Sequence, residues 1–256
     1  MITTMPTPHL SVIIPSYNEK RNLQRGVLDE VASYLSNQRY SYEILLSDDG
    51  SIDGTAQELD AFAKQHDHVR VLHNSHAGKA PTVTAGMLQA RGDWVLFTDF
   101  DQSTPISEIE KLTRWVQDYP IVIGSREIAG ARRDKEPWYR HIMGRGFNLV
   151  VQMLTVRGIQ DTQCGFKLFR QDTIQPLFGR LYVYNPNRKM EDAFTGAFDV
   201  ELLFLARIAG FAIKEVPIFW KHAPTQRVSP IKDSLRMFRD VVRIRLAHLR
   251  GKYGRA

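Results

Sequence analysis

Cysteine and long apolar runs are both scarce in this 256-residue sequence. The single cysteine, Cys164, excludes an intramolecular disulfide framework and fits a reducing compartment. A lone cysteine of this kind is more often a small buried hydrophobe than a nucleophile. No apolar run reaches the roughly 18 residues that a membrane span needs, and residues 1–10 lack the charged start and apolar stretch of a signal peptide. We therefore expect a cytoplasmic protein without a spanning segment.

Net charge is also absent from most of the chain. Residues 232–256 hold eight Lys/Arg and two Asp/Glu, which equals the +6 of the whole protein, so the rest carries 26 charges of each sign. A neutral body argues against a nucleic-acid polymer as partner, and a basic tail indicates contact with an anionic surface.

Apolar segments with strand character alternate with helical patterns along the chain. Strands are predicted at 10–15, 42–46, 69–72, 94–98, 121–123, 166–169 and 213–216, and helices at about 23–35, 55–64, 81–90, 140–154, 200–209 and 231–249. This order predicts an α/β fold, with a Rossmann-like, mostly parallel sheet and helices on both faces. We expect one domain over residues 1–230 and a basic amphipathic helix and tail over 231–256.

Asp99 and Asp101 form the sharpest local signal, because they follow a predicted buried strand. Side chains two residues apart on an extended segment point to the same side. Two converging carboxylates need a cation, and hard oxygen ligands suit Mg²⁺ or Mn²⁺, which also accept phosphate oxygens. A solvated loop with two acids is the alternative that this short pattern leaves open.

Other polar clusters are weaker when taken alone. The segment from Asp48 to Ser51 is typical of a turn, and Gly78-Lys79 lacks the spacing of a P-loop. The four histidines between residues 66 and 76 lack an accompanying cysteine, which favours solvated loop positions over a metal site. Glu191-Asp192, beside two basic residues, favours a solvated loop over a catalytic pair.

Four of these segments, in this order, resemble the family 2 glycosyltransferases. They are the opening at 11–19, the block at 48–55, Gly78-Lys79 and Asp99-Phe100-Asp101. The resemblance runs from Ser11 to about Arg243 and implies the GT-A fold and a nucleotide-sugar donor. In the second half, residues 124–126, Arg140, 161–169 and 198–203 look like the dolichyl-phosphate β-glucosyltransferase branch, which implies UDP-glucose and a dolichyl or undecaprenyl phosphate.

The same resemblance assigns roles to individual residues. Donor-binding residues would be Pro15, Tyr17, Glu19, Asp48, Asp49, Lys79, Asp99 and Arg227. Asp99 and Asp101 would hold Mg²⁺ or Mn²⁺, although Ser103 stands where related mannosyl enzymes often carry a Gln. Arg126 and Arg140 match arginines that bind the acceptor phosphate, and a surface salt bridge is the alternative for both.

Chemistry at the acceptor follows from its charge. A phosphate monoester, with a second pKa of about 6, is mostly dianionic at neutral pH and can attack the sugar without a base. Positioning two anionic phosphates calls for a metal and arginines, among which Asp101, Arg126 and Arg140 are candidates for catalysis. Asp199 stands where relatives that attack with a hydroxyl have a base; here Asp199 and Glu201 would orient groups or cap a helix.

Three alternative functions remain open. They are mannosyl transfer from GDP-mannose, transfer to a glycan hydroxyl, and a catalytically silent GT-A domain docked on a membrane.

The C-terminal pattern adds an expectation about location. On a helix over 231–249, one apolar stripe contains Ile231, Leu235, Phe238, Val242, Leu246 and Leu249, with arginines along its flank. Either this stripe packs on the enzyme's own core or it helps dock the protein, peripherally, on the cytoplasmic face of an anionic membrane that holds the lipid acceptor.

Overall fold

The computed structural model describes residues 9–134, 151–152, 154–185, 196–221 and 230–254. Their main feature is a seven-stranded sheet in the order β3-β2-β1-β4-β7-β5-β8. The strands are β1 (Leu10–Ser16), β2 (Tyr42–Asp48), β3 (Val69–His73), β4 (Trp94–Thr98), β5 (Ile121–Ser125), β7 (Phe166–Arg170) and β8 (Ile213–Pro217). Strand β7 runs antiparallel to β4 and β5, and the other pairs are parallel. The predicted mostly parallel sheet is confirmed.

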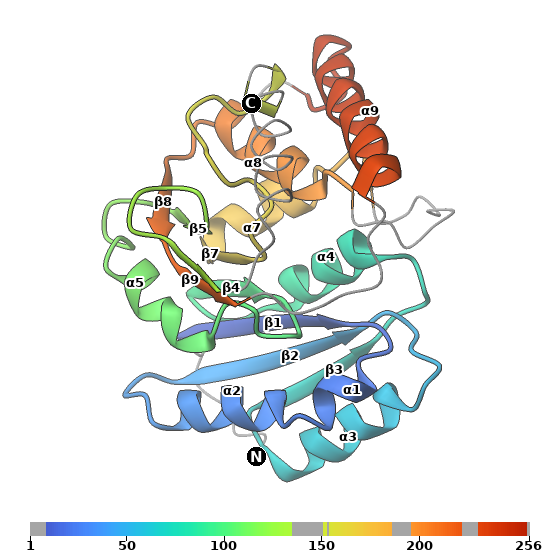
Figure 1. The fold of residues 1–256 in the computed structure, drawn as a ribbon, viewed down its shortest axis with the longest axis vertical. Coiled ribbons are helices and arrows are strands. Elements are labelled where there is room, and N and C mark those ends of the chain that lie inside the picture. Colours follow the sequence, from blue (N-terminus) through green and yellow to red (C-terminus); the bar gives the residue numbers. More distant parts are fainter. Residues whose placement is uncertain (1–8, 135–150, 153, 186–195, 222–229, 255–256) are drawn as a thin grey trace, which may run out of the picture.

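Helices cover both faces of this sheet (Figure 1). They are α1 (Lys20–Leu23), α2 (Val27–Ser36), α3 (Thr55–Gln65), α4 (Lys79–Gln89), α5 (Ile109–Thr113), α7 (Gln171–Phe178), α8 (Phe198–Ile208) and α9 (Pro230–Leu249). A single helical turn, η1 (Ile106–Glu108), precedes α5, and β6 (Arg132–Asp134) pairs with β9 (Phe219–Lys221) beside the main sheet.

Alternation along the strands creates two apolar layers. In β1, Val12 and Ile14 join the cluster with α2 and α3, whereas Ile13 joins the cluster with α4, α7 and α8. Every one of these side chains is fully buried. A strand buried on both sides in this way reads as a continuous apolar run, which is why β1 and β4 were predictable from the sequence.

Some predicted elements differ in extent. The helix expected over 23–35 begins only at Val27, as α2, because the chain turns at Gly26, whose φ of 74° suits glycine, and the short α1 ends before it, at Leu23. The sequence pattern missed α5, α7 and the small β6–β9 sheet. Most of the helix expected over 140–154 lies outside the described residues.

Helix α9 is held to the body by an unexpected face. Val241, Ile244 and Ala247 are buried in the same cluster as α8. The predicted stripe points elsewhere, and its exposed members are Leu235 at 70%, Phe238 at 44%, Leu246 at 41% and Leu249 at 68%. Packing of the stripe on the enzyme's own core is therefore wrong for these four residues. Among the described residues, no helix combines the length and the apolar character that a bilayer span requires.

Candidate active site

The carboxyl ends of β1, β2 and β4 meet at one edge of the sheet. Register pairs Ser16 with Asp48 and Ile13 with Phe97, so the loops that follow these strands are neighbours. In parallel α/β sheets, ligands bind at this edge. The structure thereby brings together most of the predicted donor and metal residues: Pro15, Tyr17, Glu19, Asp48, Asp49, Lys79, Asp99 and Asp101.

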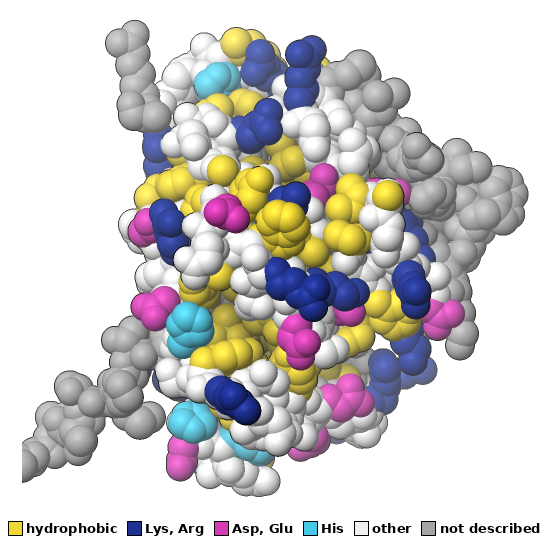
Figure 2. Space-filling model, turned by 90° about the vertical axis from the view of Figure 1, so that its left-hand side faces the viewer, with side chains coloured by type: hydrophobic (Ala, Val, Ile, Leu, Met, Phe, Trp, Pro, Cys, Tyr) yellow, Lys and Arg dark blue, Asp and Glu magenta, His cyan; other side chains and the backbone are white. Residues whose placement is uncertain are grey.

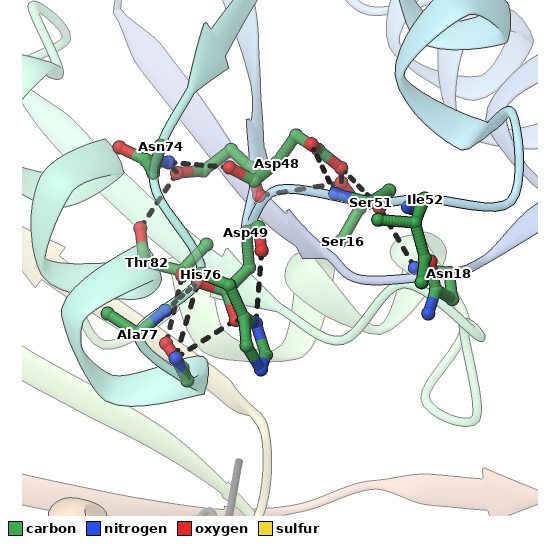
Figure 3. A network of polar contacts seen from close by, with 12 residues as sticks. Ser16, Asn18, Asp48, Asp49, Ser51, Ile52, Asn74, His76, Ala77 and Thr82 are labelled. Atoms are coloured by element: carbon green, nitrogen blue, oxygen red, sulfur yellow. Dashed lines mark hydrogen bonds and ion pairs between the residues drawn. The ribbon is translucent and has the colours of Figure 1, made fainter. Parts of the chain in front are cut away.

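Asp48 is buried and organises the loop that follows β2 (Figure 3). Its Oδ1 accepts hydrogen bonds from the hydroxyls of Ser16, at 3.1 Å, and Ser51, at 2.6 Å, while its Oδ2 accepts the backbone N–H of Ser51 at 3.0 Å. Asp48 therefore joins the ends of β1 and β2 and fixes the backbone at the strand edge.

Asp49 holds the loop that leads into α4. Its Oδ1 accepts the N–H of Ala77 at 2.8 Å, and its Oδ2 accepts the N–H of Gly78 at 2.9 Å. Nδ1 of His76 lies 2.9 Å from the same Oδ2 (Figure 3). Buried backbone groups need such partners, so Asp49 sets the position of Gly78 and of the lysine that follows it.

His76 also stacks on Tyr17. Their ring centroids lie 4.2 Å apart with an interplanar angle of 17°. His76 is an exposed loop histidine, as expected, and it is also held in place by Tyr17 and Asp49. His66 and His73 also have partners, namely the carbonyl of Phe62 and the carboxylate of Asp60. The aromatic pair forms a flat apolar wall beside the strand ends.

Two residues of this edge have left-handed backbones. Asn18, after β1, has a φ of 54°, and Gln102, after β4, has a φ of 48°. Among the described residues they are the non-glycine residues with positive φ. Such conformations are uncommon and gather at functional sites, where surrounding contacts enforce them. Asn18 is secured by Ser51 and Ile52 across the loop.

Asp99 lies between a lysine and a glycine. Nζ of Lys79, the first residue of α4, lies 2.5 Å from Oδ1. A Cβ added at Gly165 would overlap the Asp99 carboxylate, with Oδ2 nearest, so any larger residue there would displace this carboxylate. Burial lowers the pKa of Lys79, but the charges of Asp99, Asp199 and Asp101 raise it more, with a net upward shift. Lys79 is therefore a cation among three carboxylates.

The carboxyl group of Asp101 has a pKa above its ordinary value. Burial, followed by the charge of Asp99, raises the pKa of its carboxyl group. The amide N–H of Ser103 donates to its Oδ1 at 2.9 Å. Gln102 follows Asp101 in the sequence, and its Oε1 is buried without a hydrogen-bond partner among the described residues.

These features fit a divalent cation. Mg²⁺ is commonly held by one or two carboxylates, with substrate phosphates and waters completing its shell. The described residues contain no group of three or more His, Cys, Asp and Glu side chains poised around a metal. Asp99 and Asp101 supply two carboxylates, a number that suits a cation whose shell is completed by phosphate and water.

Asp199 is paired with Lys167, which is not one of the predicted site residues. Nζ of Lys167 lies 2.5 Å from Oδ1 of Asp199 and also donates to the carbonyl of Cys164. The Lys167 side chain is fully buried. A lysine inside the apolar segment of β7 was the available signal, because a buried charge needs a partner. Asp199 therefore neutralises a buried cation.

Glu201 is structural. It is fully buried and accepts the backbone N–H groups of residues 182–184 and the hydroxyl of Tyr253. Helix capping by Asp199 or Glu201, which the sequence suggested, is not observed, because α8 begins without a side-chain cap. Glu201 instead ties the segment after α7 to the chain beyond α9.

Arg126 follows β5 and is clamped by Asp161. Nε donates to Oδ2 at 2.7 Å, and Nη2 donates to Oδ1 at 2.9 Å. Burial raises the pKa of Asp161, but Arg126 lowers it more, and the net shift is downward. This salt bridge is largely buried, not the surface pair that was the alternative for Arg126. Arg140 and Arg227 lie outside the described residues.

A hollow lies on the side of the molecule that carries α5 and β8. A cavity of about 480 Å³ is lined there by Lys111, Arg114, Trp115, Asp118, Gly130, Val216 and Pro217. Figure 2 shows this side, on which Lys and Arg side chains lie next to hydrophobic ones. None of the predicted site residues lines this cavity.

Solved structures with the same architecture are glycosyltransferases of the GT-A fold. Mannosyl-3-phosphoglycerate synthase from Rubrobacter xylanophilus superposes with a TM-score of 0.65 at 17% identity, over 96% of this chain and 75% of that one. Glucosyl-3-phosphoglycerate synthase from Mycobacterium tuberculosis, in complex with UDP, gives 0.61 at 18% identity, over 97% and 81%. These similarities confirm the predicted fold class.

The chain belongs to glycosyl transferase family 2, whose sequence model matches residues 11–178. Curated relatives named dolichyl-phosphate β-glucosyltransferase are similar over nearly all of it. The Dictyostelium discoideum relative is 34% identical over 95% of this chain and 76% of its own length. The human relative is 33% identical over 97% and 78%, and the Drosophila melanogaster relative is 35% identical over the same shares. The predicted family is confirmed, and these relatives carry the name of the predicted branch.

Proposed function

We propose that this protein transfers glucose from UDP-glucose to a polyprenyl phosphate, dolichyl or undecaprenyl, with inversion at the sugar. The observation that carries the proposal is the similarity, at 33–35% identity over 95–97% of the chain, to relatives named for glucose transfer to dolichyl phosphate. An acceptor phosphate oxygen attacks C1 of glucose, the bond from C1 to the UDP oxygen breaks, and UDP leaves.

On the donor side, the nucleoside would lie at the strand edge. The Tyr17–His76 stack offers an apolar wall for a base. Asp48 and Asp49 hold the loops on either side of this stack. Pro15 and Glu19 lie at the two ends of the segment 15–19, which contains Tyr17. Lys79, and Arg227 outside the described residues, would face the diphosphate.

Asp99 and Asp101 would hold Mg²⁺ or Mn²⁺. Support comes from the paired carboxylates, the upward pKa shift of Asp101, and a structural neighbour of 18% identity from Pyrobaculum calidifontis, solved with GDP-mannose and Mn²⁺. Such a cation would neutralise charge that develops on the UDP leaving group. Asp99 and Asp101 serve to position it at the end of β4.

The acceptor side fits a phosphate better than a hydroxyl. A hydroxyl needs a general base, yet the Oδ1 of Asp199, at the corresponding place, is engaged by the buried Lys167. A phosphate dianion needs no base and instead needs cationic donors. Arg126 has five N–H donors and uses two on Asp161, so three remain for phosphate oxygens. Arg140 would be the second cation.

Helix α9 would place the enzyme at the lipid acceptor, peripherally on the cytoplasmic face of a membrane. Its exposed stripe of Leu235, Phe238, Leu246 and Leu249 is unusual for a soluble surface. Arginines at 236, 239, 243, 245 and 250 accompany it. Apolar insertion together with basic residues suits reversible binding to anionic lipid. The buried, free Cys164 agrees with a reducing compartment.

The test is a transfer assay with purified protein in detergent micelles. UDP-glucose and GDP-mannose are offered separately with dolichyl phosphate, undecaprenyl phosphate and a free glycan. We expect a β-linked glucosyl lipid from UDP-glucose with a prenyl phosphate. Faster transfer from GDP-mannose, glucose on the glycan alone, or nucleotide-sugar binding without turnover would each replace the proposal by the corresponding alternative.

A further inference from the structure

The carboxylate of Asp99 is held between Gly165 and Lys79. Both of its oxygens lie against Gly165, where an added Cβ would be 2.0 Å from Oδ2 and 2.7 Å from Oδ1, and the backbone N–H of Asp99 also donates to the Gly165 carbonyl at 3.2 Å. The ammonium of Lys79 lies 2.5 Å from Oδ1. Glycine at position 165 therefore leaves room for the carboxylate, and Oδ1 is the oxygen that the Lys79 cation contacts.

Two lysines and three carboxylates share this region. Both ammonium groups lie near the ring of Phe97, Lys79 at 5.4 Å and Lys167 at 5.9 Å from its centroid. Lys167 is fully buried and paired with Asp199, whereas the side chains of Lys79 and Asp99 are 26% and 37% exposed. Of the two ion pairs, the one between Lys79 and Asp99 is therefore the one that solvent and a ligand reach.

We propose that Lys79 and a divalent cation compete for Oδ1 of Asp99. The lysine holds this oxygen until the cation and the donor arrive, and it then turns to the donor diphosphate. This inference rests on the metal site of the proposed function and adds an exchange between two cations at one atom. Lys79 is then both an internal counter-ion and a diphosphate ligand.

Chemistry and local geometry support the exchange. Mg²⁺ and Mn²⁺ bind carboxylate oxygens closely, and an ammonium on the same oxygen both uses its lone pair and repels the incoming charge. The long flexible side chain of lysine permits the move. Lys79 begins α4, whose unpaired N–H groups and dipole favour an anion nearby. A diphosphate at this helix end would give the released ammonium a new partner.

Direct binding of Mn²⁺ to the full chain, without nucleotide, tests the competition. Free Mn²⁺ is measured by electron paramagnetic resonance for wild type, Lys79→Met and Lys79→Gln. We expect both variants to bind Mn²⁺ at least about fivefold more tightly than wild type, because a competing cation is gone. The matched control is Lys111→Met. It removes a lysine of α5 whose Nζ lies 2.6 Å from a carboxylate oxygen of Glu108 in η1. This control should bind Mn²⁺ like wild type.

A second measurement, of UDP binding, should change in the opposite direction. With Mn²⁺ at saturation, both Lys79 variants should bind UDP more weakly than wild type. The Lys79→Gln variant decides the result if Lys79→Met does not fold. Mn²⁺ binding that is unchanged or weaker in the variants, or absent from all proteins, overturns the inference. Glucose transfer by wild type is assayed separately, so its failure would be seen apart from the failure of the competition.

Discussion

Arg126 and Asp161 form a two-bond ion pair, and the backbone N–H of Arg126 adds a third bond to Oδ2 of Asp161 at 2.9 Å. The backbone N–H of Asp161 in turn donates to Glu215 of β8 at 2.8 Å. Arg126 is thus fixed in direction before any ligand binds. A guanidinium fixed in this way loses little conformational entropy when it meets a phosphate.

The first prediction concerns the stability that this pair provides. Asp161→Asn leaves a largely buried guanidinium without its counter-charge, so we expect a loss of about 3 kcal/mol in the free energy of unfolding at pH 7. Because Arg126 holds the pKa of Asp161 below its ordinary value of 3.8, the pair stabilises the fold above that pH. Its contribution is lost as pH falls through the lower, folded value.

Urea unfolding of wild type and Asp161→Asn at several pH values checks this sign. The difference should stay constant from neutral pH down to about pH 5 and shrink below about pH 4. Asp172→Asn breaks the exposed pair with Arg170 and serves as the control, with an expected change below about 1 kcal/mol. A difference that grows in acid would contradict the argument.

The second prediction separates the two substrates. Arg126→Ala and Arg140→Ala should each raise the Michaelis constant for the prenyl phosphate about tenfold or more, because each removes charged hydrogen bonds to a dianion. The constant for UDP-glucose should change much less. Initial rates with each substrate varied in turn measure both constants. If only the donor constant rises, these arginines do not serve the acceptor.

The third prediction concerns the metal. Asp101→Asn keeps an oxygen that can accept the N–H of Ser103, so we expect an intact fold, but transfer should fall by about 100-fold or more. Wild type in EDTA should lose activity and regain it with Mg²⁺ or Mn²⁺. Asp67→Asn, at an exposed position, is the control. Full activity of Asp101→Asn, or of wild type in EDTA, would contradict a metal site.

The strand edge was predictable because its signals are local. Asp99 and Asp101 directly follow an apolar strand, and the parallel sheet brings the ends of β1, β2 and β4 together. The reversed direction of β7 was not predictable, since Phe166–Arg170 would have the same apolar pattern in either orientation. Pairing direction depends on contacts between distant segments.

The partners of the site residues depend on the same distant contacts. Asp161 and Arg126 are 35 residues apart, and Lys167 and Asp199 are 32 apart. Only the buried lysine left a trace in the sequence, as a charge inside an apolar strand. The buried face of α9 could not be predicted for a similar reason. Its apolar residues lie on two faces, and the sequence alone does not indicate which face packs on the rest of the protein.

The last prediction uses that helix. Leu235 and Leu249 are 70% and 68% exposed, so replacing both by Ser should leave the fold unchanged and weaken binding to vesicles. Arg236, Arg239 and Arg243 replaced by Gln should also weaken it, since each basic residue near an anionic surface contributes about 1 kcal/mol.

Co-sedimentation with vesicles of rising anionic lipid content is the measurement, at low and high salt. Wild-type binding should rise with anionic lipid and fall with salt, because the Debye length shortens. The control removes three exposed arginines at the other end of the molecule (Figure 1), with Arg21, Arg25 and Arg39 replaced by Gln. This control should bind vesicles much better than the α9 variant that lacks three arginines, although both have lost the same charge. Equal binding of the two would mean that net charge alone attracts the protein. Equal binding of wild type and both α9 variants would reject α9 as the docking surface.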